Sequence, residues 1–309
     1  MKFLLSLIFI AGSVHMFYLV AQVRSHLDED YGVGLAVGRC LVAKCKVFRG
    51  FLATDSPKSG TPVTVKVQEE LFGMSHQTAI VSVPYSTEIL PKAPSESPGY
   101  VWEKVRLSKN APLTIVLATE RVGHVEPGAA VFVTSDERTA EEIRSLTDVA
   151  KRLAVSPDSI SEVVASLASI INPTLAGYVH MYLVHFETRR NPDRGSALLV
   201  ELVGSPSIPS GSWESVAVDA QANYYRSSLA GRATVVGRFA EIAQNSDVRA
   251  ASAALRGLER IANDDQSVRS LLPPAALSGL GDSYRALVTK GSIQRIRTLE
   301  SEFGIAYRP

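Results

Sequence analysis

The chain has 309 residues and an almost balanced charge, with 32 basic and 31 acidic side chains and a formal net charge of +1. Such a balance argues against a basic face of the size that nucleic-acid binding requires, so we expect no DNA or RNA partner. The length is comfortable for two domains.

The first segment is uncharged: residues 3–23 contain no Asp, Glu, Lys or Arg, between Lys2 and Arg24. As a helix it would be roughly 32 Å long, enough to cross a bilayer. It fits a cleaved signal peptide, with a cut after the small residues 11–13, or an uncleaved membrane anchor. A buried helix of a soluble protein is a third alternative. The first two place residues 26–309 outside the cytoplasm, secreted or periplasmic, with membrane contact only through residues 3–23 when the leader is retained.

The two cysteines, Cys40 and Cys45, are five positions apart. In an exported protein the first expectation is a disulfide. Five residues of a straight strand span roughly 16 Å, whereas bridged Cα atoms lie within about 7 Å, so a bridge needs a turn or bulge between the cysteines. Two free buried thiols are the alternative. A metal or redox role is a third, although the spacing matches neither Cys-x-x-Cys nor a complete zinc site.

Residues 33–135 have the pattern of strands separated by turn-forming residues. The expected strands cover 37–51, 62–68, 78–83, 113–118 and 129–133. In the second of these, Val63, Val65 and Val67 alternate with other residues and share one face. Five or six strands with no helix between them predict a small all-β barrel or sandwich.

After Ser135 the apolar residues recur with a helical period. One stripe consists of Ile160, Val163, Val164, Leu167, Ile170 and Ile171. Three helix starts combine a capping side chain with a proline, at Ser156-Pro157, Asn172-Pro173 and Asn191-Pro192. Further helices are expected at 213–229, 232–244, 247–262, 274–289 and 292–303. Short antiparallel helices in series predict an array in which each pair packs against its neighbours.

The use of basic residues changes where the period changes. Residues 26–140 contain seven Lys and five Arg, whereas residues 141–309 contain two Lys and sixteen Arg. We therefore expect a signal peptide or anchor at 1–25, a β domain at 26–138 and an α-helical domain at 139–309. The predicted fold class is α+β with two domains.

The helical half resembles HEAT-type repeats. Asp247, Val248 and Arg249 begin a segment rich in Ala and Leu that runs to Leu258, and a fainter copy of its start follows at 267–269. In that family an Asp caps the helix, a Val-Arg pair follows, and Ala and Leu positions pack against the next unit. The resemblance implies a scaffold that binds other proteins, and it implies no catalysis.

The strand half resembles the OB-type barrel of netrin-like and metalloproteinase-inhibitor modules. The resemblance is carried by a Cys-containing first strand at 40–51, the alternating run at 63–71 followed by Phe72-Gly73, and the strand at 128–133. Those inhibitors insert an N-terminal cysteine into the zinc site of a peptidase. No signal cut expected here leaves Cys40 as the first residue.

The sequence lacks the common motifs of catalysis, with no Walker A, Gly-x-Ser-x-Gly or His-Glu-x-x-His. His180 and His185 would point about 140° apart on a helix, unlike a metal-binding pair. The run Gly32-x-Gly34-x-x-x-Gly38 misses the dinucleotide spacing, and we expect a strand after it. We therefore expect no catalytic, cofactor-binding or metal-binding residues.

Aromatic residues flank a loop at 205–212 that is rich in Pro, Gly and Ser. We expect Trp213, Tyr224 and Tyr225 to form part of a protein-contact face. The preferred function is an exported, non-enzymatic binding or scaffolding protein that uses the surface of its helical repeats. Two other classes remain: an extracytoplasmic hydrolase or metal-dependent enzyme, and an inhibitor of extracellular peptidases. An enzyme should have a deep polar pocket with converging titratable groups, and a repeat-type binder should lack one.

Overall fold

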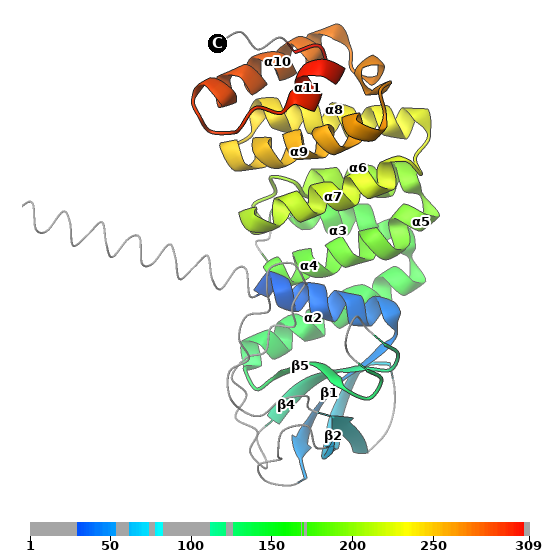
Figure 1. Ribbon diagram of the computed structural model, residues 1–309. Coiled ribbons are helices and arrows are strands. Elements are labelled where there is room, and N and C mark those ends of the chain that lie inside the picture. Colours follow the sequence, from blue (N-terminus) through cyan, green and yellow to red (C-terminus); the bar gives the residue numbers. More distant parts are fainter. Residues whose placement is uncertain are drawn as a thin grey trace, which may run out of the picture.

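The computed structural model describes residues 30–53, 62–73, 78–82, 112–121, 126–167, 169 and 172–305. The chain forms a helix at 30–43, then an antiparallel sheet, and then a stack of helices that rises from the sheet (Figure 1). The α+β architecture expected from the change of period is confirmed. The expected leader at 1–25 lies outside the described residues. Within those residues, no helix has both the length and the apolar character that crossing a membrane requires.

Five strands form the sheet in the order β3-β2-β1-β4-β5, and all neighbouring pairs are antiparallel. They are β1 (Cys45–Leu52), β2 (Pro62–Phe72), β3 (Thr78–Ser82), β4 (Pro112–Ala118) and β5 (Ala130–Thr134). The register of β1 against β2 shifts between Val47 and Phe48 and again between Arg49 and Gly50. Such irregularities bend a strand, and the sheet curls into a half-barrel. The predicted positions of β2 to β5 are confirmed.

Both faces of the sheet are buried, because successive residues of a strand point to opposite sides. On one face, Val47, Val116 and Phe132 join a large core that continues into the helices. On the other face, Phe48 and Ile115 belong to a smaller cluster formed by strand residues alone. The strand β4, between β1 and β5, is therefore buried along nearly its whole length.

Residues 37–43 form the end of a helix, so the first strand predicted from the sequence is wrong over this range. A helical stripe is present here, since Val33, Ala36, Val37, Cys40 and Leu41 follow the i, i+3, i+4, i+7, i+8 pattern and are all buried. The valines and glycines favoured a strand, but burial along one helical face outweighs these local preferences. The strand β1 begins only after residue 44, whose φ of 75° turns the chain.

The helix at 30–43 packs against α4 (Pro173–Tyr182) through glycines on both helices. A Cβ added at Gly177 would lie 2.6 Å from the carbonyl oxygen of Tyr31, and one added at Gly38 would lie 2.9 Å from the Cα of Tyr178. Only glycine lets two backbones approach this closely. The glycine run near the start of the chain therefore serves helix packing.

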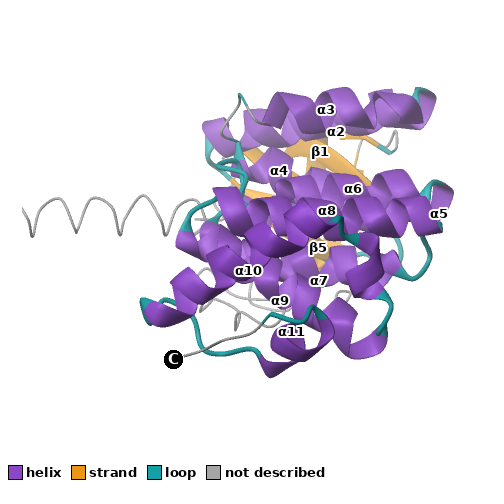
Figure 2. Ribbon diagram, turned by 90° about the horizontal axis from the view of Figure 1, so that it is seen from above, coloured by secondary structure: helices purple, strands orange, loops and turns teal. Residues whose placement is uncertain are grey.

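The sheet is followed by a series of helices. They are α2 (Glu137–Val155), α3 (Ile160–Leu167), α4, α5 (Thr188–Arg190), α6 (Pro192–Leu202), α7 (Trp213–Tyr224), α8 (Leu229–Asn245), α9 (Val248–Asp264), α10 (Pro274–Thr289) and α11 (Arg297–Glu302), with 3-10 turns η1 (Pro157–Ser159), η3 (Ser210–Ser212) and η4 (Val268–Leu271). A π-helical turn, η2 (Leu183–Glu187), joins α4 to α5. From α6 onward the helices pack in series: α6 contacts α7 and α8, α9 contacts both of these, and α10 contacts α8. Viewed along the stack, the helices cover the sheet (Figure 2).

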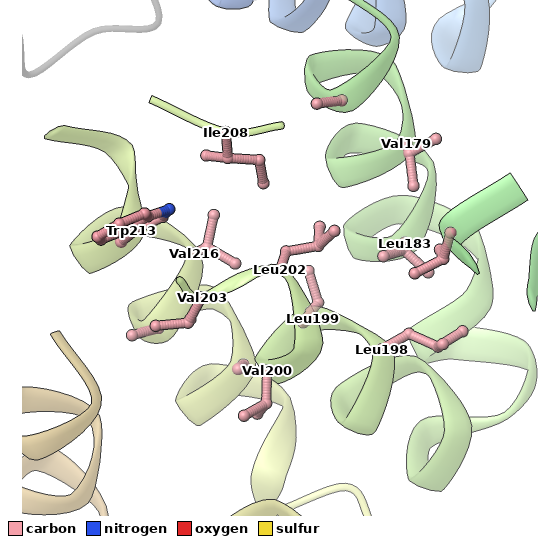
Figure 3. Packing of buried hydrophobic residues seen from close by; sticks show 14 of the residues in the cluster. Val179, Leu183, Leu198, Leu199, Val200, Leu202, Val203, Ile208, Trp213 and Val216 are labelled. Atoms are coloured by element: carbon pink, nitrogen blue, oxygen red, sulfur yellow. The ribbon is translucent and has the colours of Figure 1, made fainter. Parts of the chain in front are cut away.

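One apolar core runs from the sheet through the array to α11. Figure 3 shows a part of it, in which Leu199 and Leu202 of α6 lie between Leu183 and Val216. All four side chains are at most 1% exposed. Each helix of the array therefore depends on its neighbours to bury its apolar face.

The capping side chains behave as predicted at three helix starts. Asn172, Asn191 and Asp247 each accept hydrogen bonds from backbone N–H groups in the first turn of their helix, at 2.8 to 3.1 Å. Ser156 makes no such bond, and a 3-10 turn follows it. The helices expected at 213–229 and 292–303 are shorter than predicted, as the bounds of α7 and α11 show.

Ion pairs join the sheet to α2. The guanidinium of Arg144 donates to both carboxylate oxygens of Glu69, at 2.5 and 2.8 Å, and Arg49 donates to Glu137 at 2.6 Å. The hydrogen bonds from Arg144 hold the pKa of Glu69 below its ordinary value of 4.5. Because these side chains are partly exposed, each pair adds only modestly to stability.

Candidate functional site

Of the three aromatic residues expected in a protein-contact face, two lie in the core and one is exposed. Trp213 is 6% exposed and donates its Nε1–H to the carbonyl oxygen of Ser205 at 3.2 Å. Tyr224 is fully buried, and its hydroxyl donates to Asp265 Oδ2 at 2.7 Å. Tyr225 is 36% exposed and packs edge-on against Tyr224. The rings of Trp213 and Tyr224 are buried while their polar tips are hydrogen-bonded, so these two residues serve packing.

The two cysteines lie close together and are buried as free thiols. Cys40 sits in the last turn of the helix at 30–43, Cys45 opens β1, and the left-handed residue Lys44 makes the turn between them. The Cys40 thiol donates to the carbonyl oxygen of Leu117 at 3.8 Å, and Cys45 pairs with the next residue, Ala118. Burial and a hydrogen bond with Cys40 raise the pKa of the Cys45 thiol. The turn that a bridge requires is present, and the disulfide stays a prediction that thiol labelling of the mature protein can check.

A buried polar chain centres on His180. Its Nδ1 lies 2.6 Å from the hydroxyl of Tyr31, and its Nε2 lies 2.7 Å from Oδ2 of Asp219 on α7. Burial raises the pKa of the Tyr31 hydroxyl. Tyr31 and His180 are each 4% exposed, whereas the side chain of Asp219 at the end of this polar chain is 38% exposed. These hydrogen bonds link the helix at 30–43 to α4 and α7 of the array.

His185 lies in η2, directly after α4, which carries His180. Burial first, and then the neighbouring charge of Arg189, lower the pKa of His185. Among the residues that the structure describes, no group of three His, Cys, Asp or Glu side chains is placed to hold a metal ion.

An open cleft lies at the C-terminal end of the array and has a volume of about 730 Å³. Its walls come from the chain around η4, from α10, and from residues 303–305, which follow α11. The polar lining consists of Gln266, Ser267, Arg269, Ser270, Ser278 and Arg285. The apolar lining includes Pro274, Leu277, Phe303 and Ile305. The cleft therefore combines hydroxyl and guanidinium donors with an apolar floor.

One face of α10 forms the long wall of the cleft. The lining positions Pro274, Leu277, Ser278, Gly281 and Arg285 follow the i, i+3, i+4, i+7, i+11 pattern. Eleven helical residues make this wall roughly 16 Å long. No side chain caps the start of α10. An elongated ligand would fit along this wall.

The charge that lines the cleft is positive. Its lining contains two guanidinium groups and no carboxylate. Arg285 is paired with Asp282 at 2.6 Å, outside the lining. Arg269 packs against Gly304, where a Cβ would lie 3.0 Å from its Cζ, and has no ion-pair partner in the described part of the chain. Gly304 has a φ of +66°, which favours glycine as well.

The chemistry of this lining suits the binding of an anionic group. Among its described residues, the serines have no His, Cys, Lys, Asp or Glu beside them in the lining. Paired guanidinium groups recognise carboxylates and phosphates. The sequence predicted neither this cleft nor the chain from Tyr31 to Asp219, because both unite residues from separate segments.

No protein-family model matches this sequence, and neither a curated protein nor a solved structure matches it.

Proposed function

We propose that this chain is an exported, non-enzymatic binding or scaffolding protein whose helical array presents a surface to a protein partner. The observation that carries the proposal is the cleft at the C-terminal end of the array, whose described lining residues offer guanidinium and hydroxyl groups for binding. A serial array with one continuous core supports it, because such arrays offer long surfaces to partners.

Two finer assignments belong to this proposal. The capped helix α9, with Asp247 at its start and an Ala- and Leu-rich buried face, supports a HEAT-like array. The curled five-stranded sheet supports an OB-like barrel. Export rests on the uncharged segment at 3–23, which suits a signal peptide or a membrane anchor.

The competing functions have weaker support. An enzyme would need access to its titratable groups, yet Tyr31 and His180 are buried and lie outside the cleft. A peptidase inhibitor of the netrin-like kind would need a free cysteine at its N-terminus, yet Cys40 is buried in a helix within the chain.

The function is tested by capture and cross-linking with the full chain. A photo-reactive residue is placed at Arg238 on α8, at Arg256 on α9 or at Lys66 on β2, all partly or fully exposed. We expect a partner from the extracytoplasmic fraction to cross-link from α8 or α9. Cross-links that form only from β2, or the absence of any cross-linked protein, would overturn the proposal.

A further inference from the structure

The cleft beside α10 is lined by charged, polar and apolar side chains. Two guanidinium groups from different elements, Arg269 of η4 and Arg285 of α10, are among its described lining residues, and Arg285 also pairs with Asp282 beside the cleft at 2.6 Å. Three serine hydroxyls lie along the same walls, at positions 267, 270 and 278. Such a set of donors complements an anionic ligand that also offers hydrogen-bond acceptors.

The shape of the cleft favours an extended ligand over a small ion. The wall formed by α10 is roughly 16 Å long, the length of about five residues of extended peptide. This wall includes Pro274 and Leu277, which offer apolar contact beside the charged groups. Inorganic phosphate could contact the polar donors, but it would leave this apolar surface exposed to water.

Two glycines leave room for the arginine side chains of the cleft. Gly281 lies on the cleft face of α10, where the side chain of any other residue would enter the space beside Arg285. Gly304 lies beneath Arg269, and a Cβ there would displace the guanidinium. Both arginines are thus held at the surface of the cleft.

We propose that this cleft binds an extended acidic peptide segment. Its carboxylates pair with Arg269 and Arg285, and its apolar side chains pack against Leu277. Its backbone groups form hydrogen bonds with the serine hydroxyls. This inference rests on the proposed function, because the segment would belong to the protein partner. Charge complementarity to Arg269 and Arg285 favours an acidic occupant, and the length of the wall favours an extended chain such as a peptide.

The test is fluorescence anisotropy with the full chain and a short fluorescein-labelled peptide of alternating Glu and Leu. Arg269→Gln and Arg285→Gln should each weaken binding about tenfold, since a charge-assisted hydrogen bond is worth roughly 1.5–3 kcal/mol and 1.4 kcal/mol is tenfold. Ser278→Phe should also weaken binding, because it fills the cleft without changing charge. Arg138→Gln, which alters the ion pair with Glu142 on α2 outside the cleft, should leave binding unchanged.

Four outcomes overturn this inference. They are equal binding of a Gln-and-Leu peptide, full binding by both cleft arginine variants, displacement of the peptide by low concentrations of inorganic phosphate, and binding only to vesicles of anionic lipid. If the partner still cross-links to α8 or α9 in the Arg269→Gln and Arg285→Gln variants, the cleft assignment fails while the proposed function stands. Loss of every cross-link in the unaltered protein removes the function itself.

Discussion

The sheet and the helical array bury their apolar residues in different ways. The sheet curls, so one of its faces encloses a small cluster made of strand residues alone. The array has no cluster of its own, because its core is continuous from α2 to α11 and includes the helix at 30–43 and one face of the sheet. The helix that precedes the sheet in sequence therefore packs with the helices that follow it.

The continuous core changes how the domain boundary predicted near residue 139 is interpreted. The switch from strands to helices occurs at α2, as predicted, but the core crosses it. A fragment that begins at 139 would lack Tyr31 and the glycine-lined contact with α4. We expect such a fragment to be less stable than the array within the full chain.

The largest expected effect comes from the centre of the array. Leu255 on α9 is fully buried, so Leu255→Ala should lower the free energy of unfolding by about 2–5 kcal/mol. Denaturant melts of the full chain measure it. The control is Arg256→Ala, one position along the helix and partly exposed, which should change stability by no more than about 0.5 kcal/mol. A larger loss from the arginine variant would contradict the orientation of α9.

A smaller effect should follow when the contact between the helix at 30–43 and α4 is blocked. Gly177→Ala places a Cβ against the backbone of Tyr31, and the forced separation should cost about 1–3 kcal/mol. Gly237→Ala on α8 is the matched control, because no atom lies within 4 Å of its added Cβ. It should be neutral or stabilising by up to about 1 kcal/mol. Equal free energies of unfolding for both variants would show that the two helices are not in close contact.

Disrupting the hydrogen-bonded chain of Tyr31, His180 and Asp219 should lower the free energy of unfolding by a similar amount. His180→Ala removes the partner of both Tyr31 and Asp219, and the buried hydroxyl left without a hydrogen bond should cost about 1–3 kcal/mol. Thermal melts measure this loss, and Tyr31→Phe in the same background should recover part of it. No recovery would mean that the unpaired hydroxyl is not the cause.

The smallest effect concerns the ion pair between the sheet and α2. Glu69 has a folded-state pKa below its ordinary value of 4.5, so its stabilisation is present above that pH and is lost as the pH falls through the folded pKa. Glu69→Gln should lower stability by at most about 1 kcal/mol at pH 7 and change little near pH 2, because the pair is partly exposed. Urea melts at the two pH values test this, and an equal difference at both would contradict it.

The sequence predicted the parts of the fold that depend on local pattern. The runs of β2, β4 and β5 alternate or are continuously apolar between turn-formers, and the Asn-Pro pairs mark the helix starts. The helix at 30–43 was missed because Val33 and Val37 suggested a strand, although the helical stripe was present. The cleft could not be predicted, since Arg269 and Arg285 come together only when η4, α10 and the chain after α11 pack.

Hydrogen exchange on the full chain, with and without the cross-linked partner or the Glu-and-Leu peptide, tests the central claim that the array end is the binding surface. We predict slower exchange of the backbone amides in α10, in η4 and at 303–305, and no change in β1 to β5. Protection confined to the sheet, or no protection anywhere, would contradict the account.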